Sequence, residues 1–329
     1  MRNQPAAKIV GTGASIPEKV LTNFDLEKMV DTTDEWITSR TGIETRYIVQ
    51  DGQCTSDLGT EAALRALKDA RVKAKEVDVI IFATITSDVG FPATAVFVQK
   101  NIGAHNAAAF DIQATCTGFI YGLEMADAFI ATRRAKTVLL IGGETLSRIT
   151  DYSDRNTCVL FGDGAGAAVL QPSDDDRGIL ATYTRSDGRL HNLLMMEGMG
   201  TKNPPTAQNY HEKMQYIQME GRDVFKHAVT CMGDAAEMIL VKAGLSQADV
   251  DLLIPHQANI RIIDATAKRI KLPPEKVYVN VNKYGNTSAA SIPIAIDEAR
   301  RNGRLKQGDV AILVAFGGGF TWGSAAVRF

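Results

Sequence analysis

Three side chains from separate parts of the chain have the chemistry of a nucleophile and its assistants. Cys116 lies in DIQATCTGF, where an expected strand ends and an expected helix begins. Because the amide-rich start of a helix favours a thiolate, we expect the pKa of this thiol to lie below its usual ~8.5. His256 follows the strand-like DLLI, and Asn286 lies in YGNTSAAS. A thiolate, an imidazole and a carboxamide suit acyl transfer followed by carbon–carbon bond formation.

Each side chain has a distinct task in such chemistry. Cysteine attacks a thioester and holds the acyl group, while backbone amides stabilise the oxyanion that forms. The Nε2–H of His256 and the amide of Asn286 would donate to the enolate left when a malonyl group loses CO₂. Each residue also has a structural explanation, as a buried cysteine, a satisfied core histidine and a turn or capping asparagine. The functional prediction therefore depends on the combination.

Composition excludes several classes of protein. The 329 residues include 36 Lys and Arg against 38 Asp and Glu, a balance that does not indicate a nucleic-acid or membrane-surface binder. Four scattered cysteines without a CxxC pair form neither a disulfide framework nor a zinc motif. No apolar run approaches the ~20 residues of a membrane helix, and the first residues lack a signal-peptide core. We therefore expect a soluble, cytoplasmic protein without a metal.

The chain repeats a pattern of strands and helices. GTEAALRALKDARVKAKEVDVII resembles GDAAEMILVKAGLSQADVDLLI, and KTVLLIGGE is matched by GDVAILVAFGGG. Alternating strands and helices indicate an α/β fold with a covered, largely parallel sheet. The repeat would place Cys116 and Asn286 at matched positions after equivalent strands, where sites gather in α/β sheets. We predict two halves, 1–174 with the cysteine and 175–329 with the histidine and the asparagine.

Two polar stretches interrupt this pattern. Segment 186–215 has no clear period and contains scattered Met, Pro and Gly, so we expect an irregular surface excursion close to the site. The acidic run 174–176 is interpreted as a solvated turn rather than a metal site.

Long segments of the chain resemble one family. DIQATCTGF, IPHQANIRII, YGNTSAASIP, FGDGAGAAVL and FGGGFTWGSAAVRF are similar to signature segments of 3-oxoacyl-[acyl-carrier-protein] synthase III, the initiating ketosynthases of bacterial fatty-acid synthesis. The resemblance implies a thiolase-like fold, with two pseudo-repeated α/β halves in a layered αβαβα core, a homodimer, and no cofactor. It also implies Cys116 as the acylated nucleophile, His256 and Asn286 in decarboxylation and condensation, and an oxyanion hole from the backbone amides of Cys116 and Gly318. Elongating ketosynthases have a second His, and thiolases a second Cys, where this chain has Asn286.

The resemblance also implies binding surfaces. Trp36 and Arg155 are similar to a pair that holds the adenine of coenzyme A, although Trp36 also suits a buried anchor. The implied coenzyme A residues are Thr32, Trp36, Arg40, Arg155 and Arg222. The chain departs from the family on this path, because Asn156 replaces a frequent Gly and Arg222 a frequent Asn. Phe91 is implied to bound the acyl pocket across the dimer. The implied acyl-carrier-protein surface, which also suits a merely solvated helix face, consists of Lys226, Arg261, Lys268 and Arg269.

The expected reaction is a ping-pong condensation of an acyl-CoA primer, expected to be acetyl-CoA, with malonyl-acyl carrier protein. The alternative enzyme is a specialised ketosynthase III-like acyltransferase of secondary metabolism or of acyl-chain joining. A non-catalytic carrier-binding scaffold would not need the ordered Cys, His and Asn. A dinucleotide-binding dehydrogenase is disfavoured because GTGASI lacks the third glycine of that fingerprint.

Overall fold

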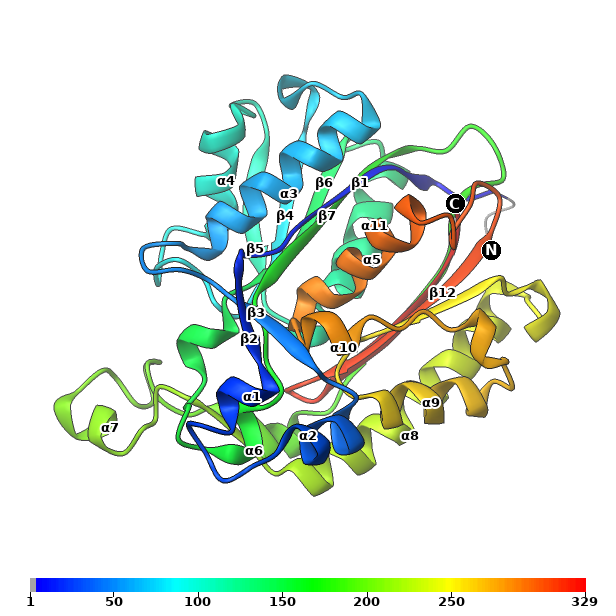
Figure 1. Ribbon diagram of the computed structural model, residues 1–329. Coiled ribbons are helices and arrows are strands. Elements are labelled where there is room, and N and C mark those ends of the chain that lie inside the picture. Colours follow the sequence, from blue (N-terminus) through cyan, green and yellow to red (C-terminus); the bar gives the residue numbers. More distant parts are fainter. Residues whose placement is uncertain (1–3) are drawn as a thin grey trace.

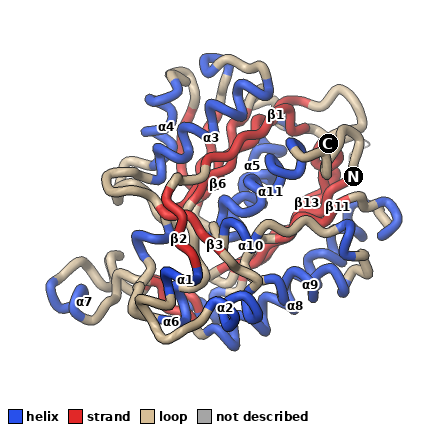
Figure 2. The backbone as a smooth tube through the Cα atoms, viewed as in Figure 1, coloured by secondary structure: helices blue, strands red, loops and turns tan. Residues whose placement is uncertain are grey.

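Two mixed sheets, one from each half of the chain, organise the molecule (Figures 1 and 2). The computed structural model describes residues 4–329. The first sheet has the order β1 (Ala7–Ser15), β7 (Gly164–Pro172), β6 (Val138–Glu144), β4 (Val79–Ala83) and β5 (Ala108–Ile112). The second has the order β11 (Leu252–Pro255), β12 (Val310–Gly317), β13 (Thr321–Arg328) and β8 (Gly178–Ser186). Two-stranded ribbons pair β2 (Lys19–Thr22) with β3 (Thr45–Ile48), and β9 (Leu194–Met196) with β10 (Ile217–Met219).

Helices form three layers around these sheets. Between the sheets lie α5 (Gly118–Ala131) and α11 (Ser291–Arg301), and both contact strands of both sheets. The first sheet is covered on its outer face by α3 (Thr55–Ala70) and α4 (Thr94–Ile102), and the second by α8 (Gly221–Ala243) and α9 (Ile260–Arg269). This αβαβα layering confirms the predicted fold class. The expectation of a largely parallel sheet is wrong, because β1, β7, β13 and β8 pair antiparallel with their neighbours.

Short helices complete the chain. The short α-helices are α1 (Asn23–Leu26), α2 (Asp34–Thr41), α6 (Arg155–Cys158), α7 (Ala207–His211) and α10 (Val281–Tyr284). The 3₁₀ turns are η1 (Ala74–Glu76), η2 (Thr115–Thr117), η3 (Leu146–Ile149), η4 (Gly188–Leu193), η5 (Gln247–Asp249), η6 (Pro274–Lys276) and η7 (Ser288–Ala290).

The core explains why the inner elements are so apolar. Strand β4, with the sequence VIIFA, is buried along its whole length because helices cover both faces of its sheet. Helix α5 is apolar on most of its surface because it lies between two sheets. One hydrophobic cluster joins residues of both halves around α5 and α11. The predicted boundary after residue 174 falls in the link between β7 and β8, and the two halves share this core.

The repeat corrects one expectation from the sequence. Turns η2 and η7 precede α5 and α11 in equivalent places, and their first residues, Thr115 and Ser288, adopt the same unusual conformation, with φ of 47° and 48°. Cys116 is therefore matched by Ala289, and the predicted match with Asn286 is wrong. The error arose because the second half replaces a full strand β5 by a single bridge, which shifts the sequence spacing before the turn.

The excursion at 186–215 is more regular than expected. It contains η4, strand β9 and helix α7, and it leads into β10, which pairs with β9. Helix α7 projects away from the body in Figure 1, whereas the β9–β10 ribbon returns to it. The acidic run 174–176 pairs with Lys8, Arg177 and Arg328. Across residues 4–329, no cluster of His, Cys, Asp and Glu could hold a metal, and no helix could span a membrane.

We predict that Gly142→Ala destabilises the fold. A Cβ at this position in β6 would lie 2.2 Å from the carbonyl oxygen of Ala289, where β6 and η7 meet. Overpacking of this kind costs about 1–3 kcal/mol, measurable by urea unfolding. The control Gly200→Ala, where nothing lies within 4 Å, should change stability by less than about 0.5 kcal/mol. Equal stabilities of the two variants would contradict the close packing of β6 on η7.

Candidate active site

The turn between β5 and α5 places Cys116 in the interior. The residue lies in η2, two positions before α5 begins, and it is only 9% exposed. Burial raises the pKa of the Cys116 thiol to about 12. The lowered pKa expected from the helix start is therefore wrong, because the loss of water around the sulfur outweighs the field of the helix. The resting nucleophile is a neutral thiol.

His256 follows β11 and is held by Ser291, the first residue of α11. The ring Nδ1 lies 2.6 Å from Ser291 Oγ, which also accepts the backbone N–H of Gln257 at 3.4 Å. The Ser291 hydroxyl can donate its proton to Nδ1, and in that tautomer the ring proton lies on Nε2. Burial lowers the pKa of His256 to about 3, so the ring is neutral at pH 7.

Asn286 is fixed through both its backbone and its side chain. Its N–H donates to Leu160 O at 2.8 Å, and its carbonyl accepts the Gly162 N–H at 3.0 Å. The side-chain Oδ1 accepts the Ser288 N–H at 2.9 Å, which identifies this atom as the oxygen. The Asn286 amide N–H groups are therefore free to donate in another direction.

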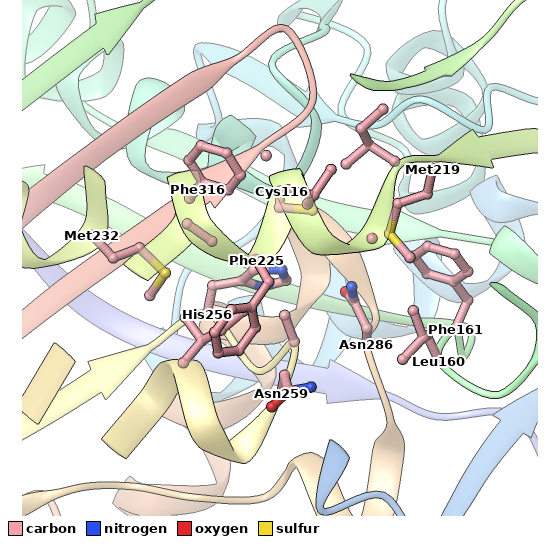
Figure 3. A pocket seen from close by; sticks show the side chains of 17 residues that line it. Cys116, Leu160, Phe161, Met219, Phe225, Met232, His256, Asn259, Asn286 and Phe316 are labelled. Carbon is pink, nitrogen blue, oxygen red and sulfur yellow. The ribbon is translucent and has the colours of Figure 1, made fainter. Parts of the chain in front are cut away.

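These three side chains border one cavity. Figure 3 shows Cys116, His256 and Asn286 around a common space, with Phe225 and Phe316 among its apolar walls. The sequence prediction that the three come together from distant segments is confirmed. The cavity brings a cysteine thiol next to two neutral side chains that can donate hydrogen bonds.

A second cavity meets the first at Cys116. Its apolar walls include Ile85, Leu146, Ile149 and Ile217. The β9 strand of the 186–215 segment closes part of it. Cys116 thus borders two cavities, one that also holds His256 and Asn286 and one that has isoleucine and leucine side chains in its walls.

Gly318 borders the second cavity, next to the nucleophile's turn. Its carbonyl accepts a hydrogen bond from the Thr115 hydroxyl at 3.1 Å. A Cβ on the preceding Gly317 would lie 2.8 Å from the backbone nitrogen of Cys116. The end of β12 therefore lies directly against the turn that carries the nucleophile.

Comparisons with known proteins agree with this arrangement. The model described as 3-Oxoacyl-[acyl-carrier-protein (ACP)] synthase III matches residues 110–188, and its C-terminal counterpart matches residues 240–329. The chain is 56% identical to a Beta-ketoacyl-[acyl-carrier-protein] synthase III of Desulfitobacterium hafniense, over 98% of this chain and 97% of the relative. It is 54% identical to one of Caldanaerobacter subterraneus, over 98% of both chains. The crystal structure of the Aquifex aeolicus synthase III has 49% identity and a TM-score of 0.92, over 98% of this chain and all of that one.

The chain belongs to the 3-oxoacyl-[acyl-carrier-protein] synthase III family. The predicted family, thiolase-like fold and enzyme class are confirmed, and membership makes the chain an acyltransferase of fatty-acid biosynthesis.

The residues implied for coenzyme A in this synthase family lie on α2, α6 and α8 or just before α2. The Arg155 guanidinium lies 4.4 Å from the centre of the Trp36 ring, so these two side chains stack on each other. The buried hydroxyl of Thr32 has no hydrogen-bond partner among the described residues. Arg40 is exposed, and its carbonyl accepts the side chain of Asn259 from the cavity wall at 3.0 Å. Arg222 is exposed at the start of α8, next to the cavity-lining Gly221.

The implied carrier residues occupy exposed positions on α8 and α9. Arg261 stacks 5.0 Å from the ring centre of Phe225, a residue that borders the catalytic cavity. Lys226 follows Phe225 on α8, and Lys268 lies two turns beyond Arg261.

Arg269 and Phe91 differ in their surroundings from the other binding residues expected from the sequence. Arg269 forms ion pairs with Glu237 at 2.8 Å and Asp234 at 3.0 Å, so its charge already has partners. Phe91 is 89% exposed and borders neither cavity of its own chain.

The sequence analysis missed the residues that hold the three site residues in place. Ser288 and Ser291, in the YGNTSAAS segment, orient Asn286 and His256 respectively. Glu144 is a fully buried acid near Cys116. A signal for Glu144 was present, because KTVLLIGGE places a charged residue at the end of an otherwise apolar strand.

We predict that Ser291→Ala releases the His256 ring. In the unchanged protein, nitrogen NMR of labelled histidine should show a neutral Nε2–H ring throughout pH 5–8, because the pKa lies at about 3. The variant should show a mixture of tautomers, since Nδ1 loses its donor. Because the folded pKa is depressed from 6.5, the contribution of His256 to stability should fall as the pH drops below 6.5. A ring that titrates near pH 6.5 in the unchanged protein would contradict this assignment.

Proposed function

We propose that the enzyme condenses an acyl-CoA primer with malonyl-acyl carrier protein in two half-reactions that share Cys116. The observation that carries this proposal is the position of Cys116 at the meeting point of two cavities. In the first half-reaction the sulfur attacks the primer thioester, coenzyme A leaves, and the acyl chain occupies the second cavity. An alkyl group matches the isoleucine and leucine side chains in the walls of this cavity. We propose acetyl-CoA as the primer.

The second half-reaction uses the neutral donors. His256 Nε2–H and the Asn286 amide donate to the thioester oxygen of the malonyl group, and this oxygen carries the enolate charge when CO₂ leaves. Neither donor needs to lose its proton, which agrees with the low pKa of His256. The enolate carbon attacks the acyl-cysteine, and the backbone amides of Cys116 and Gly318 hold the oxyanion until the sulfur leaves.

The outer residues support the choice of substrates. An indole and a guanidinium are both planar groups that stack on a base, so Trp36 and Arg155 suit the adenine of coenzyme A. The basic residues of α8 and α9 suit an acidic carrier protein, with Lys226 and Arg261 nearest to the cavity. We also propose a cytoplasmic homodimer without a cofactor, in which Phe91, exposed in one chain, borders the second cavity of its partner.

We predict that acyl-CoA labels only Cys116. Incubation with straight and branched acyl-CoAs, followed by mass spectrometry of the intact chain, should show one acyl adduct that disappears when malonyl-acyl carrier protein is added. Cys116→Ala should give no adduct, whereas Cys54→Ala, a control at an exposed cysteine, should be labelled normally. Absence of an adduct from every acyl-CoA would contradict the proposed first half-reaction.

His256→Ala and Asn286→Ala should separate the two half-reactions. Each variant should still form the acyl adduct, because its donor acts on the malonyl group. Condensation should fall by roughly 10²–10³-fold, the usual effect of removing one oxyanion donor. The ratio of the two rates, measured by mass spectrometry and by release of CO₂, checks this assignment. Condensation at the unchanged rate in both variants would show that these residues have another role.

Arg261→Glu should weaken use of the carrier protein alone. Reversal of this charge should raise the KM for malonyl-acyl carrier protein and leave acyl-CoA labelling unchanged, and added salt should reduce the difference. Arg269→Glu is a matched control on the same helix, because Arg269 already pairs with two acids. An equal effect of both variants would indicate that general charge, and not a docking surface, is responsible.

A further inference from the structure

Glu144 is a buried acid that takes no part in the proposed condensation. It ends β6 and has no exposed surface. Its carboxylate accepts hydrogen bonds from the hydroxyls of Thr86 at 2.6 Å and Thr84 at 3.1 Å, and from the Ile85 N–H at 3.1 Å. All of these donors are neutral. A buried carboxylate without a cationic partner is costly to the fold, which suggests a functional reason for its presence.

Ser288 connects this acid to the nucleophile. Its hydroxyl lies 3.1 Å from Glu144 Oε1, and Ser288 borders the same cavity as Cys116, where its hydroxyl acts to lower the pKa of the thiol. The serine is held rigidly, because its φ is 48° and its N–H donates to Asn286 Oδ1. A serine has one hydroxyl proton, so Ser288 donates to the acid or to the sulfur, but not to both.

We propose that Cys116 and Glu144 share one proton through the Ser288 hydroxyl, so that the thiol and the buried acid titrate as one unit. The S–H proton passes to Ser288 Oγ while the Ser288 proton passes to Glu144 Oε1. The unit changes from thiol and carboxylate to thiolate and carboxylic acid, and its single negative charge is conserved. In the second form Glu144 donates to Ser288, and Ser288 donates to the thiolate. The proposal rests on the proposed function only in taking Cys116 as the nucleophile.

The surroundings of Glu144 favour such sharing. Burial raises the pKa of Glu144 to about 7. Burial first, and then the nearby charge of Glu144, raise the pKa of Cys116. The other titratable groups on the elements packed around Glu144 have their own partners: Asp163 is bonded by Val49 and Ser147, Asp88 by Ser56, and His256 by Ser291. Within residues 4–329, the hydrogen-bond partners of Glu144 include no cation that would hold it ionised.

The coupling has a specific consequence for pH dependence. While Glu144 is protonated, below about pH 7, the thiolate population rises about tenfold per pH unit. Once Glu144 is ionised, the thiolate forms only when its proton moves to Glu144, and this population no longer depends on pH. The reactivity of Cys116 should therefore level off near neutrality, far below the pKa of the thiol itself.

The test is alkylation of Cys116 by iodoacetamide at a series of pH values between about 5.5 and 9, because alkylation reports the thiolate. Peptide mass spectrometry separates Cys116 from the other three cysteines. In the unchanged enzyme the rate should level off near pH 7. Glu144→Gln should instead keep rising by about tenfold per pH unit above pH 7. Glu144→Asp, which keeps the acid, should restore the levelling.

Ser288→Ala tests the bridge separately, including the case in which Glu144→Gln does not fold. It keeps the charge of Glu144 but removes the bridge, so the thiol can no longer pass its proton to Glu144. The levelling should be lost, and the rate near pH 7 should be about tenfold lower because the thiolate loses a hydrogen-bond donor. His191→Gln is the matched control at another polar side chain that borders the second cavity, and it should retain the levelling.

Two results would overturn the proposal: an unchanged enzyme whose rate keeps rising to pH 9, or a Glu144→Gln variant that levels off as the unchanged enzyme does. Because no acyl substrate is used, these results are independent of the acyl-CoA labelling. Alkylation that levels off as expected, in an enzyme that no acyl-CoA labels, would refute the proposed function and leave the shared proton in place.

Discussion

The burial of the site is the constraint on which its chemistry depends. Cys116, His256 and Asn286 are each less than a tenth exposed, so their polar groups are held by protein partners or face the cavity. The partners are neutral: Ser291 for the histidine, and a backbone N–H for the asparagine. Burial keeps the imidazole uncharged and the thiol protonated. A buried site with uncharged donors suits the proposed enolate, whose charge would develop only during the reaction.

The two halves of the chain contain the same kind of backbone turn, and the turn has a different role in each half. The same left-handed residue begins η2 and η7, and the same kind of helix follows each turn. In the first copy the next residue is the nucleophile Cys116, and in the second it is the small Ala289, which packs closely against Gly142. The second copy contributes Ser288 and Ser291, which orient the residues around the nucleophile. Two related turns thus meet at one point with different side chains.

The sequence contained enough to predict the family, the layering and the convergence of the three residues, because these depend on long segments and on apolar periodicity. The sequence alone did not show which of two opposing effects on the pKa of Cys116, the helix start or burial, is the larger. The start of a helix is visible in a sequence, whereas the depth of burial depends on how the second half packs against the first. The match of Cys116 to Ala289 was not predicted for a related reason. The number of residues before the turn differs between the halves, because the second half has a single bridge in place of β5. Hydrogen bonds such as that between Ser291 and His256 join residues 35 positions apart, and only the fold reveals them.

The stacked pair on α2 and α6 has a consequence for the proposed exchange of substrates. The Arg155 guanidinium lies over the Trp36 ring, and Arg155 also donates to the Asp31 carbonyl at 2.9 Å. In the proposed binding of coenzyme A, an arriving adenine would exchange this stacking contact for others, and the pair would form again when the nucleotide leaves. A reaction that releases free coenzyme A before its second substrate enters would benefit from side chains that compete with the ligand in this way.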